Sequence, residues 1–479
     1  MRKKILDLEK ISRLLEPSPR ERKEVRKKVI SYTEEFLKSI EKLKAYNVTL
    51  DKGAGILDSP IGEKGIPIDD ALGLLRENVD FPGLNPASGG HLGYIPGGGI
   101  YFSSLADYMA DIFNRYAGVF FAGPGAVRME NMLIAWMSKV AGYPKTAAGN
   151  LTTGGSLANL MGIVTARDAM NISAKDIERS VIYLSKQVHH SVDKAIRIAG
   201  LKECVLRCLP LDEKYRIIPS ALERQIQLDR KNKLNPFLVI ASAGTTDVGA
   251  IDPLSEIGDI ARKHRTWYHI DAAYGGFFIL TDEGKKKLSG MEKSDSLVID
   301  PHKGLFLPYG LGVLLVKERK FLNASHFYQA NYMQDTLSHT EELSPADLSP
   351  ELTKHFRGLR LWLPLKLHGI EPFRTCLEEK LLLAKYFHAE IQKLGFESQL
   401  EPELSVVVYR YLPRKGRADT FNKKLLDEVV ADGRVFISST LLNGKFTLRF
   451  ACLAFRTHLK TVDTLLKVLK EKVKILERQ

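Results

Sequence analysis

Residues 267–306 read WYHIDAAYGGFFILTDEGKKKLSGMEKSDSLVIDPHKGLF. The stretch holds two short apolar runs, WYHI and SLVI, and each run is followed directly by a polar segment, DAAYGG or DPHKG. Consecutive apolar and β-branched residues are typical of strands that are buried on both faces of a sheet. The interval between the runs has room for a helical crossover. The stretch therefore predicts two neighbouring strands whose carboxyl ends carry Asp271, Asp300, His302 and Lys303.

The same alternation continues on both sides of this stretch, over about residues 101–320. Further apolar runs are VIYLS from residue 181, FLVIASAG from 237 and GVLLVK from 312, and helical segments such as LANLMGIVTARDAM, from 157, lie between such runs. Strands that alternate with longer helices are typical of an α/β fold. We expect a mostly parallel central sheet with helices on both faces.

The chain length and the change of pattern predict three parts. Residues 1–85 form an N-terminal helical segment, with one helix expected over about 19–44, and residues 86–365 form the large α/β domain. Residues 366–479 form a smaller α+β domain, with a helix at 375–394 and strands near 404 and 445. The Gly/Pro-rich sequence FPGLNPASGGHLGYIPGGG, residues 81–99, predicts a loop that is either a linker or part of a site.

The composition excludes a disordered or collagen-like chain, because 44% of the 479 residues are hydrophobic and 9% are aromatic. The net charge of +13 raises the question of a nucleic-acid or membrane partner. Residues 1–50 carry 14 basic and 8 acidic side chains and residues 455–479 carry 7 and 3, so +10 of the charge lies on the two ends. Both ends read as amphipathic helices. We therefore expect solvated helix faces, no nucleic-acid partner and no membrane partner.

Cysteine usage and the hydropathy pattern indicate the compartment. The four cysteines, at positions 204, 208, 376 and 452, form no CxxC pair, which argues against both a zinc motif and a disulfide framework. No run reaches 18 consecutive apolar residues, and the basic N-terminus is not followed by an apolar signal segment. The sequence predicts a cytoplasmic protein without a metal.

Three predicted strand ends carry groups that could do chemistry. Gly154, Gly155 and Ser156 precede a helix and could bind an anion with backbone N–H groups, or could simply begin that helix. Asp271 is a carboxylate that needs a donor at a buried strand end, although it could also cap the next turn. Lys303 could be a nucleophile toward a carbonyl group or an ordinary surface lysine.

Together these groups meet the requirements of one cofactor. Pyridoxal phosphate needs an anchor for its phosphate, a carboxylate that keeps its pyridine nitrogen protonated and an amine that reacts with its aldehyde. The Gly-Gly-Ser turn, Asp271 and Lys303 supply these three groups on successive strands.

The sequence also resembles the group II pyridoxal-phosphate-dependent amino-acid decarboxylases, the family of the aromatic-amino-acid, histidine and glutamate decarboxylases. The resemblance spans about residues 80–370, and its motifs occur in the family's order. The matching strings are WMSKVAGYP from residue 136, LTTGGSLANLMGIVTAR from 151, QVHHSVDKA from 187, SAGTTDVGAIDP from 242, YHIDAAYGG from 268, DSLVIDPHKG from 295 and FRGLRLW from 356. The combination of HIDAAYGG with DPHK is highly specific to this family.

The resemblance implies the type I fold of pyridoxal-phosphate enzymes and decarboxylation of an L-amino acid to its amine and CO2. It also implies a homodimer with active sites at the interface, in which the N-terminal segment forms part of the dimer contact. Lys303 would form a Schiff base with the cofactor, and Asp271 would pair with the pyridine nitrogen. His189 and Ala273 would pack on opposite faces of the cofactor ring.

The remaining roles also follow from the resemblance. Gly155, Ser156 and Asp300 match phosphate-binding positions, and the resemblance places Thr246, in the GTT string, near them at the cofactor. His302 would lie close to the head group of the amino-acid substrate, and Tyr94 matches a substrate-pocket position.

Two positions depart from the family pattern. Gly304 stands where the family usually has Trp, and the segment SPADLSPELTKH before Phe356 lacks the Tyr that is thought to return a proton to the substrate carbon. Tyr328, Tyr332 or His302 could replace that Tyr. The alternatives are therefore another reaction with the same cofactor (aldehyde synthesis, transamination or carbon–sulfur cleavage) and a basic scaffold or nucleic-acid-binding protein without activity. The identity of the substrate stays open at this point.

Overall fold

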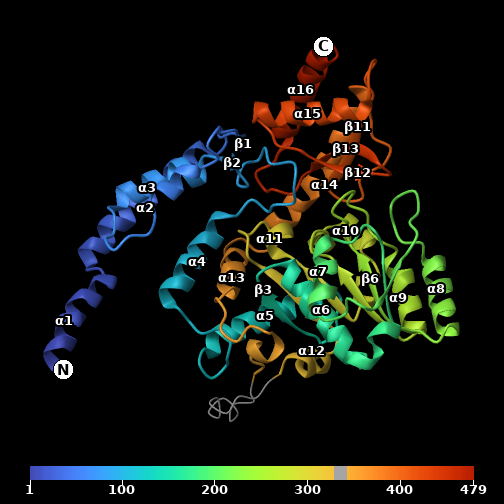
Figure 1. The fold of residues 1–479 in the computed structure, drawn as a ribbon, viewed down its shortest axis with the longest axis horizontal. Helices are drawn as coiled ribbons and strands as arrows, with labels where there is room; N and C mark the ends of the chain where they lie inside the picture. The colour runs from blue at the N-terminus through green and yellow to red at the C-terminus, as the bar shows by residue number, and fades with distance from the viewer. Residues whose placement is uncertain (328–341, 479) are drawn as a thin grey trace.

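The computed structural model describes residues 1–327 and 342–478. Its N-terminal helices extend as an arm to one side of the molecule, with the N-terminus at the tip (Figure 1). The helix α2 begins with a capping box, in which the Ser18 side chain accepts from the Glu21 N–H and the Glu21 side chain accepts from the Ser18 N–H. The elements of the arm are α1 Arg2–Ser12, α2 Pro19–Ser39, β1 Tyr46–Asn47, α3 Ile68–Leu75 and β2 Gly83–Leu84.

A seven-stranded sheet forms the centre of the molecule, in the order β3-β9-β8-β7-β6-β4-β5. The strand β9 is antiparallel to both of its neighbours, and the other neighbouring pairs are parallel. The mostly parallel sheet of the predicted α/β fold is thus confirmed. The strands are β3 Ala148–Thr152, β4 Ser180–Leu184, β5 Val205–Cys208, β6 Asn235–Ser242, β7 Trp267–Asp271, β8 Ser296–Ile299 and β9 Gly312–Val316.

Helices cover both faces of this sheet, because successive strand residues point to opposite sides. In β6, Val239 and Ala241 share a core with α5, α8 and α9, whereas Leu238 and Ile240 share a second core with α6, α7 and α12. Both sets are fully buried, which explains the continuous apolar run in the sequence. The helices of this domain are α4 Tyr101–Phe113, α5 Pro124–Val140, α6 Gly155–Ala169, α7 His190–Ile198, α8 Pro219–Lys231, α9 Leu254–Lys263, α10 Asp282–Lys287, α11 Pro301–Gly304, α12 Arg319–His326 and α13 Gly358–His368.

The C-terminal part has an antiparallel sheet in the order β10-β11-β13-β12, packed against helices. As its periodicity predicts, the last helix buries one face, including Val462, Leu465 and Leu469. Part of the Gly/Pro-rich loop joins this sheet, since Leu92 bonds through its backbone to Phe436 and Ala451. The elements are α14 Glu371–Lys393, β10 Phe396–Glu397, β11 Val406–Tyr411, α15 Ala418–Asp432, β12 Ser438–Leu442, β13 Lys445–Ala451 and α16 Leu459–Leu476.

The predictions about metals, cysteines and membranes can be compared with the described residues. Within residues 1–327 and 342–478, the side chains form no His, Cys, Asp or Glu cluster that could hold a metal ion. All four cysteines are free thiols. In the same part of the chain, none of the helices combines the length and the apolar character that crossing a bilayer requires.

Candidate active site

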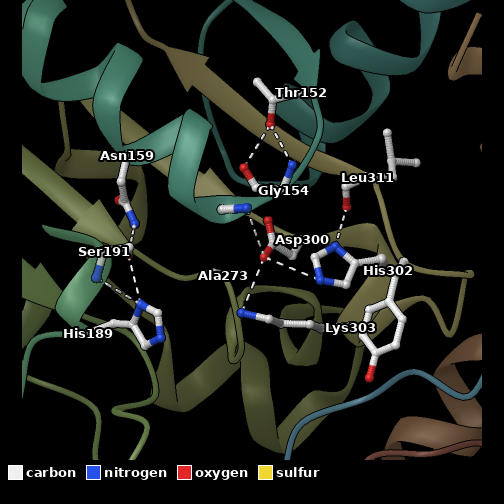
Figure 2. Close-up of polar contacts among 12 residues, drawn as sticks. Thr152, Gly154, Asn159, His189, Ser191, Ala273, Asp300, His302, Lys303 and Leu311 are labelled. Atoms are coloured by element: carbon white, nitrogen blue, oxygen red, sulfur yellow. Dashed lines mark hydrogen bonds and ion pairs between the residues drawn. The ribbon is translucent and has the colours of Figure 1, made fainter. Parts of the chain in front are cut away.

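The predicted chemical residues meet at a cavity of about 390 Å³ at the carboxyl ends of β6, β7 and β8. Ligands of open α/β sheets bind at this edge, where the strands give way to loops. Figure 2 shows the polar side chains of this region converging from α6, α7 and the turn after β8. Apart from Tyr94, all the predicted site residues line the cavity: Gly155, Ser156, His189, Thr246, Asp271, Ala273, Asp300, His302 and Lys303.

The lysine lies on the short helix α11, which follows β8 directly. Its Nζ is 3.2 Å from Oδ2 of Asp300, and a quarter of its side chain is exposed in the cavity. Asp300 is fully buried, and the same Oδ2 accepts the N–H of Gly155 at 3.2 Å. One carboxylate thus holds both the lysine amine and the first residue of α6 (Figure 2).

The N-terminus of α6 has room for an anion. The N-cap residue, Gly154, makes no side-chain hydrogen bond, and Asp300 takes only the N–H of Gly155, so the N–H groups of Ser156 and Leu157 are available to a ligand. Gly154 has a φ of +157°, and its backbone N–H and C=O both bond to the hydroxyl of Thr152. A Cβ at Gly155 would lie 2.8 Å from Asp300 Oδ2 and 3.2 Å from the Cβ of Ala273. Only glycine fits at this point, which explains the Gly-Gly pair.

Asp271 ends β7 and is 91% buried, so its carboxylate needs donors. Its Oδ1 accepts the N–H of Ala273 at 3.1 Å, and its Oδ2 accepts the Nδ2–H of Asn159 at 3.0 Å. These neutral donors hold the carboxylate in one orientation, and no Lys, Arg or His of residues 1–327 and 342–478 forms an ion pair with it. The arrangement suits a cationic ring nitrogen of a ligand.

His189 is the residue before α7, and Ser191 fixes its ring. Its Nδ1 lies 2.8 Å from Oγ of Ser191 and accepts the Ser191 backbone N–H at 3.2 Å. Burial is the main cause that lowers the pKa of His189, and the neighbouring His190 ring, 4.0 Å away between centroids, adds to this. His189 is therefore predominantly neutral at pH 7.

His302 and Thr246 complete the predicted cavity set. Nδ1 of His302 lies 2.6 Å from the carbonyl oxygen of Leu311, so this nitrogen carries the hydrogen and Nε2 faces the site. Burial lowers the pKa of His302, which makes Nε2 a proton acceptor at neutral pH. Arg449 fixes the backbone of Thr246, because its guanidinium donates a hydrogen bond to the Thr246 carbonyl.

Tyr94 does not line the cavity of the single chain. It packs on Phe436 of the C-terminal part, 5.5 Å between ring centroids, and about half of its surface is exposed. Tyr328 and Tyr332, two of the suggested replacements for the absent catalytic Tyr, lie outside the described residues.

Asn159, Ser191 and Tyr309 are among the cavity residues that the sequence pattern did not indicate. The signal for Asn159 was present, because Asn is unfavourable in a helix interior and this one follows Gly155 by one turn. Tyr309 follows the lysine turn in an irregular segment, where periodicity carries no information.

The described residues fit pyridoxal phosphate. An uncapped helix N-terminus faces the cavity beside Gly155, a carboxylate held by neutral donors lies at Asp271, and the Lys303 amine is exposed between them.

The comparisons with known proteins agree with this chemistry. Residues 90–412 match the sequence profile of the pyridoxal-dependent decarboxylase conserved domain. The aromatic-L-amino-acid decarboxylase of Bacillus atrophaeus is 35% identical over 431 residues, which cover 88% of each chain. A phenylacetaldehyde synthase of Arabidopsis thaliana is 29% identical and covers 78% of this chain and 80% of its own.

Solved structures support the same fold. The crystal structure of Oryza sativa TDC with PLP and tryptamine superposes with a TM-score of 0.90 at 24% identity, and the match covers 96% of this chain and 99% of that one. The type I fold and the predicted family are therefore confirmed. The chain belongs to the pyridoxal-dependent decarboxylase family, and it is an enzyme that uses pyridoxal phosphate to release the carboxylate of an amino acid as CO2.

Proposed function

We propose that this decarboxylase acts on an aromatic L-amino acid. The observation that carries the proposal is the position of Tyr309, which lines both the cavity and a neighbouring pocket of about 320 Å³. That pocket presents apolar surface from Leu84, Pro96 and Leu307. A flat apolar side chain that extends from the cavity past Tyr309 would bury its surface there.

The charges near the two pockets argue against an acidic side chain. Asp80 lines the second pocket and would repel a carboxylate. Of the arginines that the sequence offered, Arg357 pairs with Glu351 at 3.0 Å, and Arg449 bonds to the carbonyls of Thr246 and Asp247. Arg115 does not line either pocket. The similarity to the aromatic-L-amino-acid decarboxylase of Bacillus atrophaeus supports the same substrate class.

In the proposed site, Lys303 would bind the aldehyde of the cofactor, and Asp271 would accept a hydrogen bond from its ring nitrogen. His189 and Ala273 would contact the cofactor ring. Pyridoxal phosphate, when bound, supplies a conjugated ring that withdraws the electron pair left by the departing carboxylate. The protein's own contribution is to orient the Asp271 carboxylate and to hold the reacting groups in place.

The phosphate is proposed to lie at the N-terminus of α6, near Gly155, Ser156 and Thr246. An ionised carboxylate cannot donate a hydrogen bond to a phosphate. We therefore assign Asp300 a different part, in which it orients the Lys303 amine and the Gly155 backbone. This refines the role that the family resemblance implied for Asp300.

We further propose that the enzyme is a homodimer with active sites at the subunit interface. Tyr94 is exposed and lies outside its own cavity, so it is available to the site of a second subunit. The arm supports the same assembly, because no residue of α1, α2 or α3 is buried.

We also propose a cytoplasmic location, which the free cysteines support. Cell fractionation tests this proposal.

The substrate proposal is tested with purified enzyme and a panel of tryptophan, tyrosine, phenylalanine, glutamate, aspartate and histidine. We expect CO2 and the matching amine in equal amounts from at least one aromatic substrate, and no product from the acidic ones. Preference for an acidic amino acid would refute the substrate class.

The same assay tests aldehyde synthesis, which the absence of Tyr from residues 344–355 and the similarity to phenylacetaldehyde synthase keep as a second candidate. Aldehyde, ammonia and peroxide in place of amine would identify that reaction. Lys303→Ala serves as the control and is expected to abolish either product.

A further inference from the structure

A continuous chain of buried hydrogen bonds runs beneath the candidate active site. Nε1 of Trp267 donates to Oγ of Ser296 at 2.8 Å, and the same Oγ lies 2.7 Å from Nδ1 of His269. Nε2 of His269 lies 2.9 Å from Oδ1 of Asn159. These four side chains are at least 96% buried.

This series of hydrogen bonds branches at Asn159. Its Nδ2 donates to Oδ2 of Asp271 at 3.0 Å and to Oγ of Ser191 at 3.2 Å. Ser191 in turn lies 2.8 Å from Nδ1 of His189 (Figure 2). The Asn159 amide therefore contacts the Asp271 carboxylate and Ser191, the residue that holds the His189 ring. The proposed function assigns both Asp271 and His189 to the cofactor.

Asp271 and Trp267, at the two ends of this hydrogen-bond series, fix the donor and the acceptor of every bond between them. Oδ2 of Asp271 is the acceptor at this contact, so the atom of Asn159 that faces it is the amide nitrogen. Oδ1 of Asn159 then faces His269, whose Nε2 must carry the hydrogen. Burial lowers the pKa of His269 to about 4, so its Nδ1 is free to accept the hydroxyl hydrogen of Ser296. The Ser296 oxygen accepts from the indole of Trp267, which can only donate.

The second branch is equally determined. Oγ of Ser191 accepts from Asn159, so its own hydrogen points to Nδ1 of His189. The backbone N–H of Ser191 donates to the same nitrogen. A neutral His189 must then carry its hydrogen on Nε2.

We propose that Asn159 is a positioning residue of this enzyme, which orients the Asp271 carboxylate as a hydrogen-bond acceptor for the pyridine nitrogen and fixes His189 as the Nε2–H tautomer. The inference rests on the proposed roles of Asp271 and His189. It adds Asn159, on α6, as the residue that orients both of them.

The packing around His269 supports a site built for this purpose. A Cβ at Gly162 would lie 2.7 Å from Cε1 of His269. Gly162 therefore lets α6 approach β7 closely. Asn159, one turn earlier in α6, can then reach both Asp271 and the His269 ring. An apolar residue at position 159 would fill the space but would leave Asp271 with one donor fewer.

The test compares Asn159→Ala and Asn159→Leu with Asn150→Ala. Asn150 is the matched control, because it is equally buried and its amide also makes a bond to a charged group: it donates to the carbonyl of Pro345 and accepts from Lys354, away from Asp271 and His189. The first readout is the dissociation constant of pyridoxal phosphate, measured by titrating the cofactor-free protein. We expect about a tenfold to hundredfold weakening in both Asn159 variants, the range for losing a buried hydrogen bond to a charged group, and much less in Asn150→Ala at a similar unfolding midpoint.

The second readout is the tautomer of His189 in the cofactor-free protein, from nitrogen NMR of histidine-labelled enzyme, with the signal assigned by its absence in His189→Gln. We expect Nε2–H in the wild type and a mixture of tautomers in Asn159→Ala. Wild-type cofactor affinity together with an unchanged His189 signal in both Asn159 variants would overturn the proposal.

Two further variants separate this outcome from a failure of the proposed function. Asp271→Asn and His189→Ala are each expected to weaken cofactor binding. If they do and the Asn159 variants do not, the positioning role fails and the proposed function stands. If neither of them weakens binding, the proposed roles of Asp271 and His189 are wrong, and the inference falls with them.

Discussion

Burial favours the neutral form of His91 and His269. Burial lowers the pKa of His91 to about 4, and it does the same for His269, where the negative charge of Asp271 opposes the shift without cancelling it. In the unfolded chain each titrates near 6.5. Between these values the unfolded chain binds more protons than the folded one, so the stability that each neutral histidine contributes is lost as the pH falls from about 6.5 toward 4.

His91 offers the cleaner test, because both of its ring nitrogens are buried without a hydrogen-bond partner among the described residues. Its ring packs edge-on against Tyr94 and Phe436. We predict that wild-type stability against urea falls between pH 7 and pH 5, with about 2 kcal/mol of the loss due to His91. His91→Phe should keep the ring packing and lose less stability over the same interval.

Unfolding midpoints by circular dichroism at the two pH values check this prediction. His368→Gln is the control, because its side chain is exposed and forms no ion pair within residues 1–327 and 342–478, and it should show the wild-type loss. Equal acid sensitivity of His91→Phe and wild type would contradict it.

At the scale of elements, the turn after β8 packs closely against the segment Gly276–Leu280. A Cβ at Gly304 would lie only 2.6 Å from the Cβ of Phe277, which is fully buried. The ring of Phe277 therefore occupies space beside the lysine helix that a larger residue at 304 would need. This is the physical reason for glycine where the family usually has Trp.

We predict that Gly304→Ala lowers the stability by about 1–3 kcal/mol, the usual cost of an added methyl group in a packed core. Thermal unfolding measures the effect. The control is Gly125→Ala in α5, where a Cβ would meet no atom within 4 Å, and it should leave the unfolding temperature unchanged or raise it. A Gly304→Ala protein as stable as this control would show that α11 shifts freely.

A second contact between elements anchors the segment that follows residue 341. Nζ of Lys354 lies 2.9 Å from Oε2 of Glu130 in α5, and both side chains are almost fully buried. The same Nζ donates to Oδ1 of Asn150 and to the carbonyl of Leu151 in β3, the strand that leads into the Gly-Gly turn. The ion pair thus fixes this segment to the cofactor domain.

We predict that Lys354→Met destabilises the protein by about 3–5 kcal/mol, because it leaves the Glu130 carboxylate buried and unpaired. The double variant Lys354→Met with Glu130→Leu removes that charge as well and should recover part of the loss. Urea unfolding of both variants gives the comparison. No recovery in the double variant would mean that the cost comes from the Asn150 and Leu151 contacts instead.

The sequence predicts an element well where the residues of that element alone determine its structure. Runs such as FLVIASAG identify buried strands, because the residues on both sides of the strand are apolar. The antiparallel direction of β9 is not visible in GVLLVK, since strand direction is set by the connections around it. Asn159 was missed for a similar reason, because its importance comes from Asp271 and Ser191, which lie 112 and 32 residues away.

At the scale of the whole molecule, the N-terminal arm leaves apolar surface uncovered. Leu14 and Leu15, just after α1, are 82% and 89% exposed, and the arm extends away from the body (Figure 1). Burying a leucine side chain contributes about 1.5–3 kcal/mol. In the proposed homodimer, this surface is covered by the second subunit.

We predict that the wild type sediments as a dimer and that the double variant Leu14→Asp with Leu15→Asp weakens the dimer at least about a hundredfold, because each dimer loses the burial of four leucines. Sedimentation velocity over a range of concentrations measures this. Leu228→Asp, at an exposed leucine of α8, is the matched control and should remain dimeric. The variant chain should still bind pyridoxal phosphate, since the cavity residues of each chain are intact, but should lose turnover if Tyr94 serves the neighbouring site. A dimeric arm variant, or a monomeric and fully active wild type, would contradict the proposed assembly.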